Sequence, residues 1–486
     1  MTATVATIAA AVPSALVVSL EGSPDAEADI VDLTHDSRQV GPGWAFACVV
    51  GERSDGHDYA ATAVDAGATM LLVERTLPLD VPQLVVTDVR RAMGHAAAAV
   101  HGHPADRLTI VGITGTNGKT TTTAMLGSIL RAAGREVRTQ GTLSGTRTTP
   151  EAPDLQRQLA GYVADGVDSV VMEVSSHAMV YHRVDGTRFS VVGFTNLGRD
   201  HLDLHESMEA YFRAKASLFD PERAAEGVTN VDDPSGRLIL DAGEIPMTGY
   251  GAADATDVSV GVDHVRFTWR DTPVDVPIGG HFNVMNAVAA LTLADRLGID
   301  PATAAAGLAA CTTVPGRFET VSDPERDEIA VVVDYAHTPD GLEELLRSAR
   351  QLAGGGRVLA VFGCAGDRDQ EKRAPMGSVG SSLADLAVIT SDNPRGEDPS
   401  AILADVFAGV AREHQATTFT EVDRRRAIAR AIRAAEPGDI VVVAGKGHEA
   451  TQTIADEVRP FDDRVVAREL LTELASTTPD STGAPQ

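Results

Sequence analysis

Cysteine and long apolar runs are scarce in this chain, and both absences exclude classes of protein. Its 486 residues include three cysteines, Cys48, Cys311 and Cys364, which lie far apart and form no CxxC pair. Neither a disulfide framework nor a zinc site is therefore expected. The first twenty residues lack a basic leader and contain Pro13, so the sequence predicts no signal peptide and no membrane insertion. These absences favour a cytoplasmic protein.

Basic residues are also in short supply. The chain has 41 Lys+Arg against 69 Asp+Glu, which gives a formal net charge of −28. Because nucleic acids are bound through basic surfaces that neutralise their phosphates, no nucleic-acid partner is expected. Hydrophobic residues make up 43% of the chain, which is typical of a globular protein. At about 150 residues per domain, the length suggests three domains.

The most informative stretch is residues 108–130, LTIVGITGTNGKTTTTAMLGSIL. Its order predicts a buried strand, a glycine-rich turn and a helix. In this arrangement the loop N–H groups face phosphates, Lys119 reaches the β/γ oxygens and the Thr120 hydroxyl ligates magnesium. A glycine-rich turn without a ligand is the alternative, which the GxxxxGKT pattern disfavours. The nucleotide-binding residues expected here are Gly115, Thr116, Asn117, Gly118, Lys119, Thr120 and Thr121.

This loop predicts ATP or GTP binding, and by itself it leaves synthesis, movement and switching open. Three α/β domains are expected around it. Residues 1–106 alternate short apolar runs with glycine turns, as in a small α/β domain, and residues 107–327 predict a central domain with a parallel sheet and an antiparallel insert at 245–278. Residues 328–475 alternate strand and helix patterns, which predicts a Rossmann-like parallel sheet, and residues 476–486 predict a disordered tail.

In the third domain, charged loops follow the predicted strands. Loops 363–373, 391–399 and 445–449 each mix glycine with several charged residues. Because the functional loops of a parallel sheet lie at the carboxyl ends of its strands, these loops are expected to bind a ligand, and three merely solvated loops are the alternative. Strands are expected at 329–334, 358–362, 386–390 and 440–444, and helices near 341–352, 400–412 and 423–435.

Several polar residues of the first two domains have two possible interpretations. Glu173 ends an apolar strand and is either a magnesium ligand or an ion-paired or capping residue. His201 lies in a polar loop and is interpreted as a metal or phosphate group, although a single histidine is more often structural. Lys215, among aromatic residues of a helix, is on sequence alone a surface lysine. Residues 35–38, HDSR, are either a hydrogen-bonded turn or an anion or sugar contact.

Taken together, these residues resemble the Mur ligases, the ATP-dependent amide-forming enzymes of peptidoglycan synthesis. The resemblance covers nearly the whole chain. It rests on GITGTNGKTTT, MEVSSHA, FTNLGRDHLDLH, FNVMNA, VPGRFE, VVVDYAHTPDGL, GCAGDRD and AGKGHE, in the order and approximate spacing of the family. Within the family, HDSR and DNPRGEDP are most similar to the members that add meso-2,6-diaminopimelate.

The resemblance implies an enzyme that joins meso-diaminopimelate to UDP-MurNAc-L-Ala-D-Glu in cytoplasmic peptidoglycan precursor synthesis. ATP would phosphorylate the γ-carboxylate of D-glutamate, the amine of diaminopimelate would attack the acyl phosphate, and phosphate would leave. Magnesium and Lys119 would offset the charge on the transferring phosphoryl group. The expected ligands are these three substrates and Mg²⁺, and the enzyme is expected to be a monomer.

By the same resemblance, Thr120 and Glu173 would hold one Mg²⁺, and His201 with Lys215 would place a second. Lys215 would be carbamylated, because CO₂ converts its cation into a carboxylate-like anion that accepts a metal. The motif AYFRAKASLF matches the family's position, so the resemblance favours this role over a surface lysine. The catalytic residues it implies are Lys119, Glu173, His201 and Lys215.

Three further sets of residues are implied as substrate contacts. ATP would also meet Asn286, Arg317 and Asp334. The sugar nucleotide would meet Ser37, Thr148, Thr149, Ser175 and Arg183, hydroxyl and guanidinium groups suited to diphosphate and sugar. Diaminopimelate would meet Arg368, Asp392, Asn393, Pro394, Arg395, Gly445 and Glu449. The family often has glutamine two positions before the arginine of the second set, where this chain has Tyr181.

Three rival interpretations stay open. A ligase of the same family that adds L-lysine would differ at the residue after Pro394, and Arg395 favours diaminopimelate. Folylpolyglutamate synthase shares the last two domains and should lack the first domain with its HDSR sequence. A phosphate-loop switch or nucleic-acid motor is disfavoured by the acidic charge and by the charged loops of the third domain.

Overall fold

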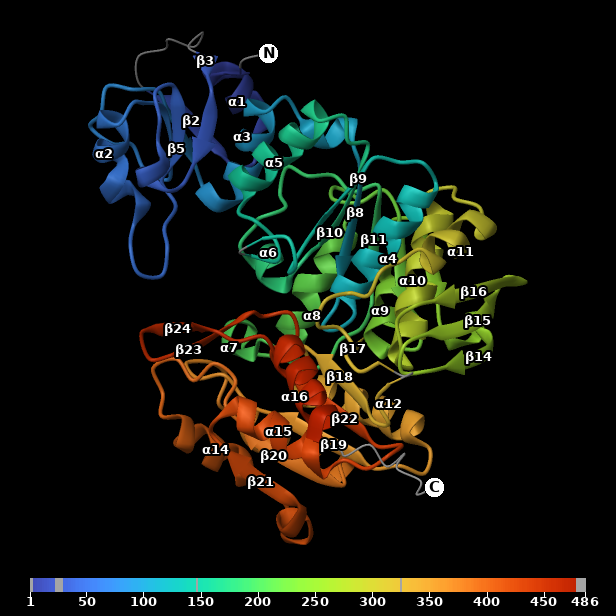
Figure 1. Ribbon diagram of the computed structural model, residues 1–486. Helices are drawn as coiled ribbons and strands as arrows, with labels where there is room; N and C mark the ends of the chain where they lie inside the picture. Colours follow the sequence, from blue (N-terminus) through green and yellow to red (C-terminus); the bar gives the residue numbers. More distant parts are fainter. Residues whose placement is uncertain (1–2, 22–28, 146, 324–325, 478–486) are drawn as a thin grey trace, which may run out of the picture.

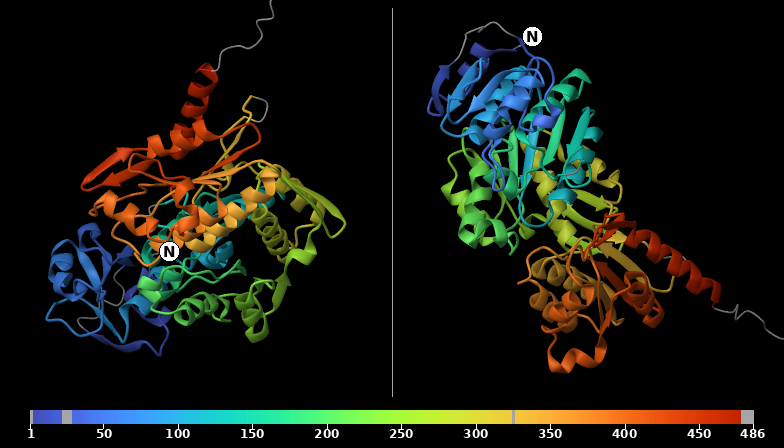
Figure 2. Two further views of the ribbon diagram at one scale, coloured as in Figure 1. Left: turned by 90° about the horizontal axis from the view of Figure 1, so that it is seen from below. Right: turned by 90° about the vertical axis from the view of Figure 1, so that its left-hand side faces the viewer.

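The computed structural model describes residues 3–21, 29–145, 147–323 and 326–477. Figure 1 shows three bodies: an N-terminal domain in blue, a central domain from teal to yellow, and a C-terminal domain in orange and red. In the right-hand view of Figure 2 they follow one another, with the central domain in the middle. Each body contains its own sheet, which confirms the predicted three-domain α/β fold class. Among the described residues, no helix is long and apolar enough to cross a membrane.

The N-terminal domain is a five-stranded sheet covered by short helices. Its helix α3 (Val89–Val100) turns a row of alanines and Met93 onto the sheet, which buries them in one apolar core. The domain begins before residue 30, with helix α1 (Val5–Ala11) and strand β2 (Val17–Glu21). Strand β2 pairs antiparallel with β7 (Gln83–Val86). In sheet order the strands are β2 (Val17–Glu21), β7 (Gln83–Val86), β6 (Ala68–Val73), β5 (Trp44–Ala47) and β4 (Asp32–Thr34).

The central domain is a six-stranded parallel sheet. Its middle strand β8 is buried from Ile110 onward and leads straight into the phosphate loop and helix α4 (Lys119–Ala132). The apolar faces of α4, α10 (Phe282–Arg296) and α11 (Pro301–Ala309) share one core with the sheet. In sheet order the strands are β13 (Met247–Tyr250), β12 (Gly227–Asn230), β11 (Val191–Phe194), β8 (Thr109–Thr114), β10 (Ser169–Glu173) and β9 (Val137–Gln140).

The predicted insert over 245–278 needs a correction. Its first strand, β13, pairs in parallel with β12 and belongs to the main sheet. The antiparallel sheet contains only β14 (Thr256–Val260), β15 (Val265–Trp269) and β16 (Thr272–Val276). A 3₁₀ turn at Ala252–Asp254 separates β13 from these three strands. The sequence did not predict this division, because short strands that follow one another have similar patterns in either sheet. The other central helices are α5 (Ala152–Ala164), α6 (Ser176–Val180), α7 (Leu202–His205), α8 (Met208–Ala216) and α9 (Pro234–Ala242).

The C-terminal domain is built on a second six-stranded sheet. Strands β19 and β22 are buried along their whole length, as in parallel sheets covered on both faces. The chain enters this sheet at β17, before the predicted boundary at 327/328, and β17 pairs antiparallel with β18. In sheet order the strands are β17 (Glu319–Thr320), β18 (Ala330–Asp334), β22 (Ile440–Ala444), β19 (Val358–Phe362), β20 (Leu386–Thr390) and β21 (Thr418–Glu421).

In the described residues, five α-helices and a hairpin complete this domain. The last helix continues to Thr477, so residues 476 and 477 are helical and not part of a tail, because apolar positions such as Leu470 and Leu471 hold this helix on the core. The rest of the predicted tail, 478–486, lies outside the described residues. The elements are α12 (Pro339–Ala353), α13 (Arg373–Leu383), α14 (Pro399–Phe407), α15 (Arg424–Ala434), α16 (Asp463–Thr477), β23 (Thr451–Ile454) and β24 (Glu457–Pro460).

The segment that joins the central and C-terminal domains meets a loop of the C-terminal domain in a backbone-to-backbone contact. A Cβ atom built on Gly316 would lie 2.1 Å from the carbonyl carbon of Gly447. Both residues have positive φ angles, +64° and +50°. Only glycine permits this combination of close approach and left-handed backbone at low energy.

Candidate active site

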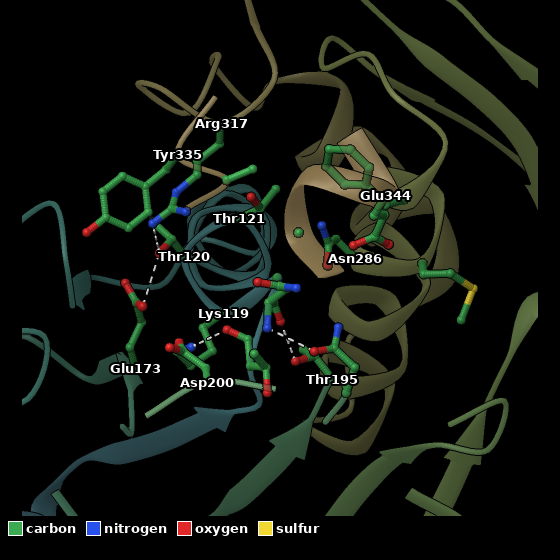
Figure 3. Close-up of a pocket in the computed structure, with 18 of the residues that line it drawn as sticks. Lys119, Thr120, Thr121, Glu173, Thr195, Asp200, Asn286, Arg317, Tyr335 and Glu344 are labelled. Carbon is green, nitrogen blue, oxygen red and sulfur yellow. Dashed lines mark hydrogen bonds between the residues drawn. The ribbon is translucent and has the colours of Figure 1, made fainter. Parts of the chain in front are cut away.

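A cavity of about 510 Å³ lies at the carboxyl ends of the central strands, facing the C-terminal domain. In Figure 3, side chains from the phosphate loop, β10 and α10 point toward it, together with Arg317 and Tyr335. The cavity brings together most of the residues expected for phosphate and metal and two of those expected for the sugar nucleotide. The expected residues that line it are Thr116, Asn117, Gly118, Lys119, Thr120, Thr121, Thr148, Glu173, Ser175, His201, Lys215, Asn286, Arg317 and Asp334.

Lys119 begins α4 and turns its ammonium group back onto the phosphate loop. Its Nζ donates to the carbonyl oxygens of Gly115 and Thr116, each at 2.8 Å. Burial lowers the pKa of Lys119 below its ordinary value. The neighbouring Gly118 has a φ of +83°, and a Cβ there would lie 2.3 Å from Oδ1 of Asn286. The loop therefore packs against α10 only with glycine at this position.

Glu173 ends β10 and accepts hydrogen bonds from two neighbouring segments. Thr120 Oγ1 donates to its Oε2 at 3.0 Å, and the Thr142 amide donates to its Oε1 at 2.9 Å. Arg317 donates through Nη2 to the same Thr120 hydroxyl at 3.2 Å, as Figure 3 shows. Among the described residues, Glu173 forms no ion pair, so the ion-pair interpretation is not supported.

The donor set around Thr120 and Glu173 suits magnesium. Mg²⁺ prefers oxygen ligands and is bound by one or two protein groups together with waters and substrate phosphates. A hydroxyl and a carboxylate oxygen 3.0 Å apart match this requirement. In the described part of the chain, no group of three or more His, Cys, Asp or Glu side chains is placed to hold a metal ion. Magnesium at this position would therefore depend on phosphate oxygens of the nucleotide.

His201 caps α7 and is partly buried beside the cavity. Its Nε2 lies 3.2 Å from Oδ2 of Asp200, and its ring meets that of His177 edge to face at 4.6 Å between centroids. Burial is the main cause that lowers the pKa of His201 to about 4, against the opposing effect of Asp200. The ring is therefore neutral at neutral pH, which is the form that ligates metals.

Lys215 is buried, at 1% exposure, so the surface-lysine interpretation is wrong. Its Nζ donates to the Gly115 carbonyl oxygen at 2.8 Å and lies 4.4 Å from the centre of the Tyr211 ring. Burial lowers the pKa of Lys215 well below its ordinary value, and the charge of Lys119 lowers it further. The amine of Lys215 is therefore desolvated, which favours its neutral form over the ammonium form.

The other residues expected for ATP come from the junction of the two domains. The Asp334 carboxylate accepts the amides of Phe318 and Ala336, each at 2.7 Å, and burial raises the pKa of Asp334. It therefore supports the turn that carries Arg317. The Arg317 guanidinium stacks on the Tyr335 ring at 4.4 Å and reaches across to α4.

Four of the five residues expected for the sugar nucleotide lie together. Thr149 Oγ1 donates to the Glu173 carbonyl oxygen at 2.9 Å and accepts the Ser175 amide at 3.1 Å. Arg183 donates to the Thr149 carbonyl oxygen at 3.4 Å. The fifth residue, Ser37, lies in a 3₁₀ turn of the N-terminal domain and is not among the residues that line the cavity.

The residues expected for diaminopimelate form a second cluster, on the loops after β20 and β22. Asn393 is buried, donates to Glu449 at 2.8 Å and accepts the Thr453 amide at 2.9 Å. The Arg395 amide donates to the Thr453 carbonyl oxygen at 3.0 Å, with Arg395 at a φ of +52°. Asp392, Pro394 and Gly445 belong to the same two loops, and Arg368 lies exposed on the loop after β19.

The ion pair beneath these loops was not expected from the sequence. Arg424 and Asp463 are both fully buried, at 2.7 Å between Nη2 and Oδ2. Arg424 also donates to the carbonyl oxygens of Ser391 and Ala444, at 3.1 and 2.9 Å. These carbonyls lie where the loops after β20 and β22 begin, so Arg424 connects the bases of the two loops. The only signal was the arginine run 424–426, which does not show which arginine turns inward.

The fold and the cavity define a three-domain phosphate-loop protein with a second cluster of charged loops. Comparison with known families places it more closely. Residues 29–101 match the Mur ligase family catalytic domain, residues 113–294 match the Mur ligase middle domain, and residues 316–447 match the Mur ligase glutamate ligase domain.

Individual relatives agree over nearly the whole length. The chain is 44% identical over 478 residues to the UDP-N-acetylmuramoyl-L-alanyl-D-glutamate–2,6-diaminopimelate ligase of Streptomyces coelicolor, covering 92% of this chain and 94% of that protein. It is 44% identical over 470 residues to the ligase of the same name from Geobacillus thermodenitrificans, covering 92% and 95%. A solved structure of a ligase with that name matches at a TM-score of 0.68 and 30% identity, covering 98% of this chain and 99% of the other.

The chain belongs to the Mur ligase family, whose members are ATP-dependent ligases that form amide bonds. A folylpolyglutamate synthase of Mycobacterium tuberculosis shares the fold at a TM-score of 0.59 and 18% identity, covering 80% of this chain and 96% of the other.

Proposed function

We propose that this enzyme adds meso-2,6-diaminopimelate to UDP-MurNAc-L-Ala-D-Glu, with ATP as co-substrate and Mg²⁺ as cofactor, in the cytoplasm. Relatives at 41–44% identity are named for this activity. The structural observation that carries the proposal is Arg395, which lies on the same loop as Asn393 and is held there by backbone hydrogen bonds to Thr453 and Ala455. In the described part of the chain, no carboxylate forms an ion pair with Arg395, so its charge is available to a ligand.

Diaminopimelate and lysine differ by one carboxylate at the far end of the side chain. A planar, permanently charged guanidinium suits that carboxylate, because it donates two parallel hydrogen bonds. The loop holds Arg395 through its backbone at both ends, since its amide donates to Thr453 and its carbonyl oxygen accepts the Ala455 amide at 2.6 Å. Among the described residues, the side chain makes one hydrogen bond, from Nη1 to the Gly366 carbonyl oxygen at 3.0 Å. Its other donors would remain for the substrate.

The chemistry follows from the poor reactivity of a carboxylate. An oxygen of the D-glutamate γ-carboxylate attacks the γ-phosphorus of ATP, ADP leaves, and an acyl phosphate results. The amine of diaminopimelate then attacks the acyl carbon, loses a proton, and inorganic phosphate departs with the electron pair of the broken C–O bond. Lys119 and the loop amides would stabilise charge on the transferring phosphoryl group, and Arg317 would approach the same group from the C-terminal side.

Thr120 and Glu173 would hold one Mg²⁺, and His201 with a carbamylated Lys215 would hold a second. Bound magnesium would supply positive charge next to the phosphoryl oxygens. Lys215 has the property that carbamylation needs, since its lowered pKa favours the neutral amine that attacks CO₂. The new N–C bond forms with loss of one proton and leaves a carboxylate-like anion in place of the cation.

A screen of amino acids tests the proposal. Purified enzyme would receive ATP, Mg²⁺, UDP-MurNAc-L-Ala-D-Glu and one amino acid at a time, with phosphate release and product mass as readouts. We expect turnover with meso-diaminopimelate at least tenfold above that with L-lysine, and none without the sugar nucleotide. A preference for lysine would show that lysine, and not meso-diaminopimelate, is the amino-acid substrate. Phosphate release stimulated by nucleic acid, with no ligation product, would reject the function.

A further inference from the structure

Three arginines converge on one buried carboxylate where the N-terminal and central domains meet. Arg90 comes from α3 of the N-terminal domain, and Arg147 and Arg183 come from the central domain. Nη2 of Arg183 lies 2.9 Å from Oε1 of Glu151, and Nη1 of Arg90 lies 3.9 Å from its Oε2. Arg147 forms an ion pair with the same carboxylate. A single Glu151 charge does not balance three guanidinium groups, so positive charge concentrates at this point of a chain whose net charge is −28.

Among the described residues, a buried donor of this cluster has no hydrogen-bond partner. It is Nε of Arg183, whose side chain is 14% exposed. Burial lowers the pKa of Arg183, in spite of the nearby carboxylate. Buried polar groups are normally satisfied, and exceptions often mark the place of an ion or ligand. Arg183 also donates to the Thr149 carbonyl oxygen, which joins the cluster to the hydroxyl groups beside the cavity.

Tyr181 aligns two of these arginines from opposite sides of the domain boundary. The guanidinium of Arg90 lies 5.0 Å from the centre of its ring, and that of Arg183 lies 5.5 Å away. The Tyr181 hydroxyl donates to Oε1 of Glu52 in the N-terminal domain at 3.1 Å. A cation–π contact holds a guanidinium without neutralising its charge. Tyr181 therefore keeps both cations in place and leaves them able to bind an anion.

We infer that Arg90 and Arg147 join Arg183 to bind an oxyanion of the sugar nucleotide, and that Tyr181 is a positioning residue for Arg90 and Arg183. This inference rests on the proposed function, because UDP-MurNAc-L-Ala-D-Glu carries both phosphate and carboxylate oxyanions. Guanidinium groups bind either kind through paired, charge-assisted hydrogen bonds. Because Arg90 belongs to one domain and the other two arginines to the next, the bound anion also fastens the N-terminal domain to the central domain.

Calorimetric titration with UDP-MurNAc-L-Ala-D-Glu tests this site. We expect Arg90→Ala and Arg147→Ala each to weaken binding about tenfold, the effect of losing one charge-assisted contact. The matched control is Arg91→Ala on the same helix, since Arg91 is exposed and forms no ion pair among the described residues; its affinity should stay within about twofold of wild type. Unchanged binding of a non-hydrolysable ATP analogue shows that each variant is folded. Arg147 is half exposed on a loop, so its variant tests the site even if Arg90→Ala fails to fold.

Titrations with UDP alone and with UDP-MurNAc-L-Ala separate the two sources of the oxyanion. A loss that appears with UDP alone assigns the cluster to the diphosphate, and a loss that appears only with the full substrate assigns it to a glutamate carboxylate. Tyr181→Phe should bind as wild type and Tyr181→Leu several-fold more weakly, with ATP-analogue binding unchanged in both, because only the ring is needed. If Arg90→Ala and Arg147→Ala both bind the full substrate normally, the inference is wrong and the proposed function stands. If the wild-type enzyme does not bind UDP-MurNAc-L-Ala-D-Glu, both the inference and the proposed function are wrong.

Discussion

The central and C-terminal sheets carry buried cations in opposite ways. At the carboxyl ends of the central strands, Lys119 and Lys215 both donate to one carbonyl oxygen, that of Gly115, and neither forms an ion pair within the described residues. In the C-terminal domain, Arg424 is fully buried against the equally buried Asp463. One sheet therefore holds cations without counter-ions, and the other holds a neutral pair.

The difference separates the candidate active site from a structural support of the fold. A buried cation without a counter-ion is unfavourable, and it shifts its pKa toward the neutral form, as both lysines do. An incoming anion would stabilise the charged form of such a group, and CO₂ would react with its neutral form. In a buried ion pair the two charges neutralise each other, so neither is available to a ligand. Removal of one partner destabilises the fold, because the other charge stays buried and unpaired. The comparison thus predicts where substitutions abolish chemistry and where they destabilise the fold.

Lys119→Ala should have the largest effect, a loss of product formation of about 1,000-fold or more, because it removes the cation that meets the transferring phosphoryl group. The melting temperature should not fall, since the variant removes a desolvated charge that has no ion partner. Steady-state phosphate release and thermal melting measure the two quantities. Arg131→Ala, exposed on the same helix, is the control. Near-normal turnover of Lys119→Ala would defeat the nucleotide assignment.

Arg424→Ala should have the opposite profile, a lower free energy of unfolding by about 3–5 kcal/mol, because Asp463 would remain buried and unpaired. Urea denaturation measures this change. Arg426→Ala on the same helix, 77% exposed, should change the free energy by less than about 0.5 kcal/mol. The double variant Arg424→Met, Asp463→Leu should recover most of the loss. Unchanged stability of Arg424→Ala would show that the pair is not a structural support.

Lys215→Ala should lower turnover about 100-fold, since the carbamate would be a metal ligand and alanine cannot form one. In wild-type enzyme supplied with ¹³C-labelled bicarbonate, NMR should show a carbamate carbon, whose signal grows as rising pH deprotonates the amine. The signal should persist in Lys372→Ala and vanish in Lys215→Ala. Full activity of Lys215→Ala would exclude the modification from the mechanism.

Arg395→Ala should have the smallest effect, a loss of at least about tenfold in kcat/KM for meso-diaminopimelate, because one Arg–carboxylate contact is removed. Its preference over lysine should narrow, while KM for ATP changes little. Competition between the two amino acids measures the preference, and Arg459→Ala, exposed on β24, is the control. Equal losses for both amino acids, or an unchanged preference, would make Arg395 a structural residue of its loop.

Much of the fold could be predicted because the parallel strands are short and continuously apolar. Strands β19, β20 and β22 begin and end at the predicted residues, and the phosphate loop leads from strand to helix as its glycine pattern indicated. Helix α13 was not predicted, because its sequence RAPMGSVGSSL contains residues of low helix propensity. Tertiary packing explains why a glycine stands in this helix, since a Cβ on Gly380 would lie 2.1 Å from the Phe362 ring.

The site shows the same division. The residues expected for phosphate and metal come from motifs that are contiguous in the chain, and the structure brings most of them to one cavity. On sequence alone Lys215 was predicted to be a surface lysine, which is wrong because its burial, at 1% exposure, depends on how α8 packs beneath the phosphate loop. Arg424 could not be found, since its partner lies 39 residues away in another helix. The arginine cluster at Glu151 contains residues of two domains. A local sequence pattern does not predict a contact between segments so far apart in the chain.

The glycine pair at the junction of the last two domains has a consequence for protein engineering. Gly316 and Gly447 touch through their backbones, in conformations that other residues rarely adopt. A chimera whose crossover lies between α11 and Gly316 takes both glycines from the same parent and keeps this contact. A crossover after Gly316 keeps it only if both parents have glycine there, because an alanine at either position would clash with the facing backbone and displace the connection between the two domains. The position of the crossover relative to Gly316 should therefore decide whether amino-acid specificities can be recombined without disturbing this junction.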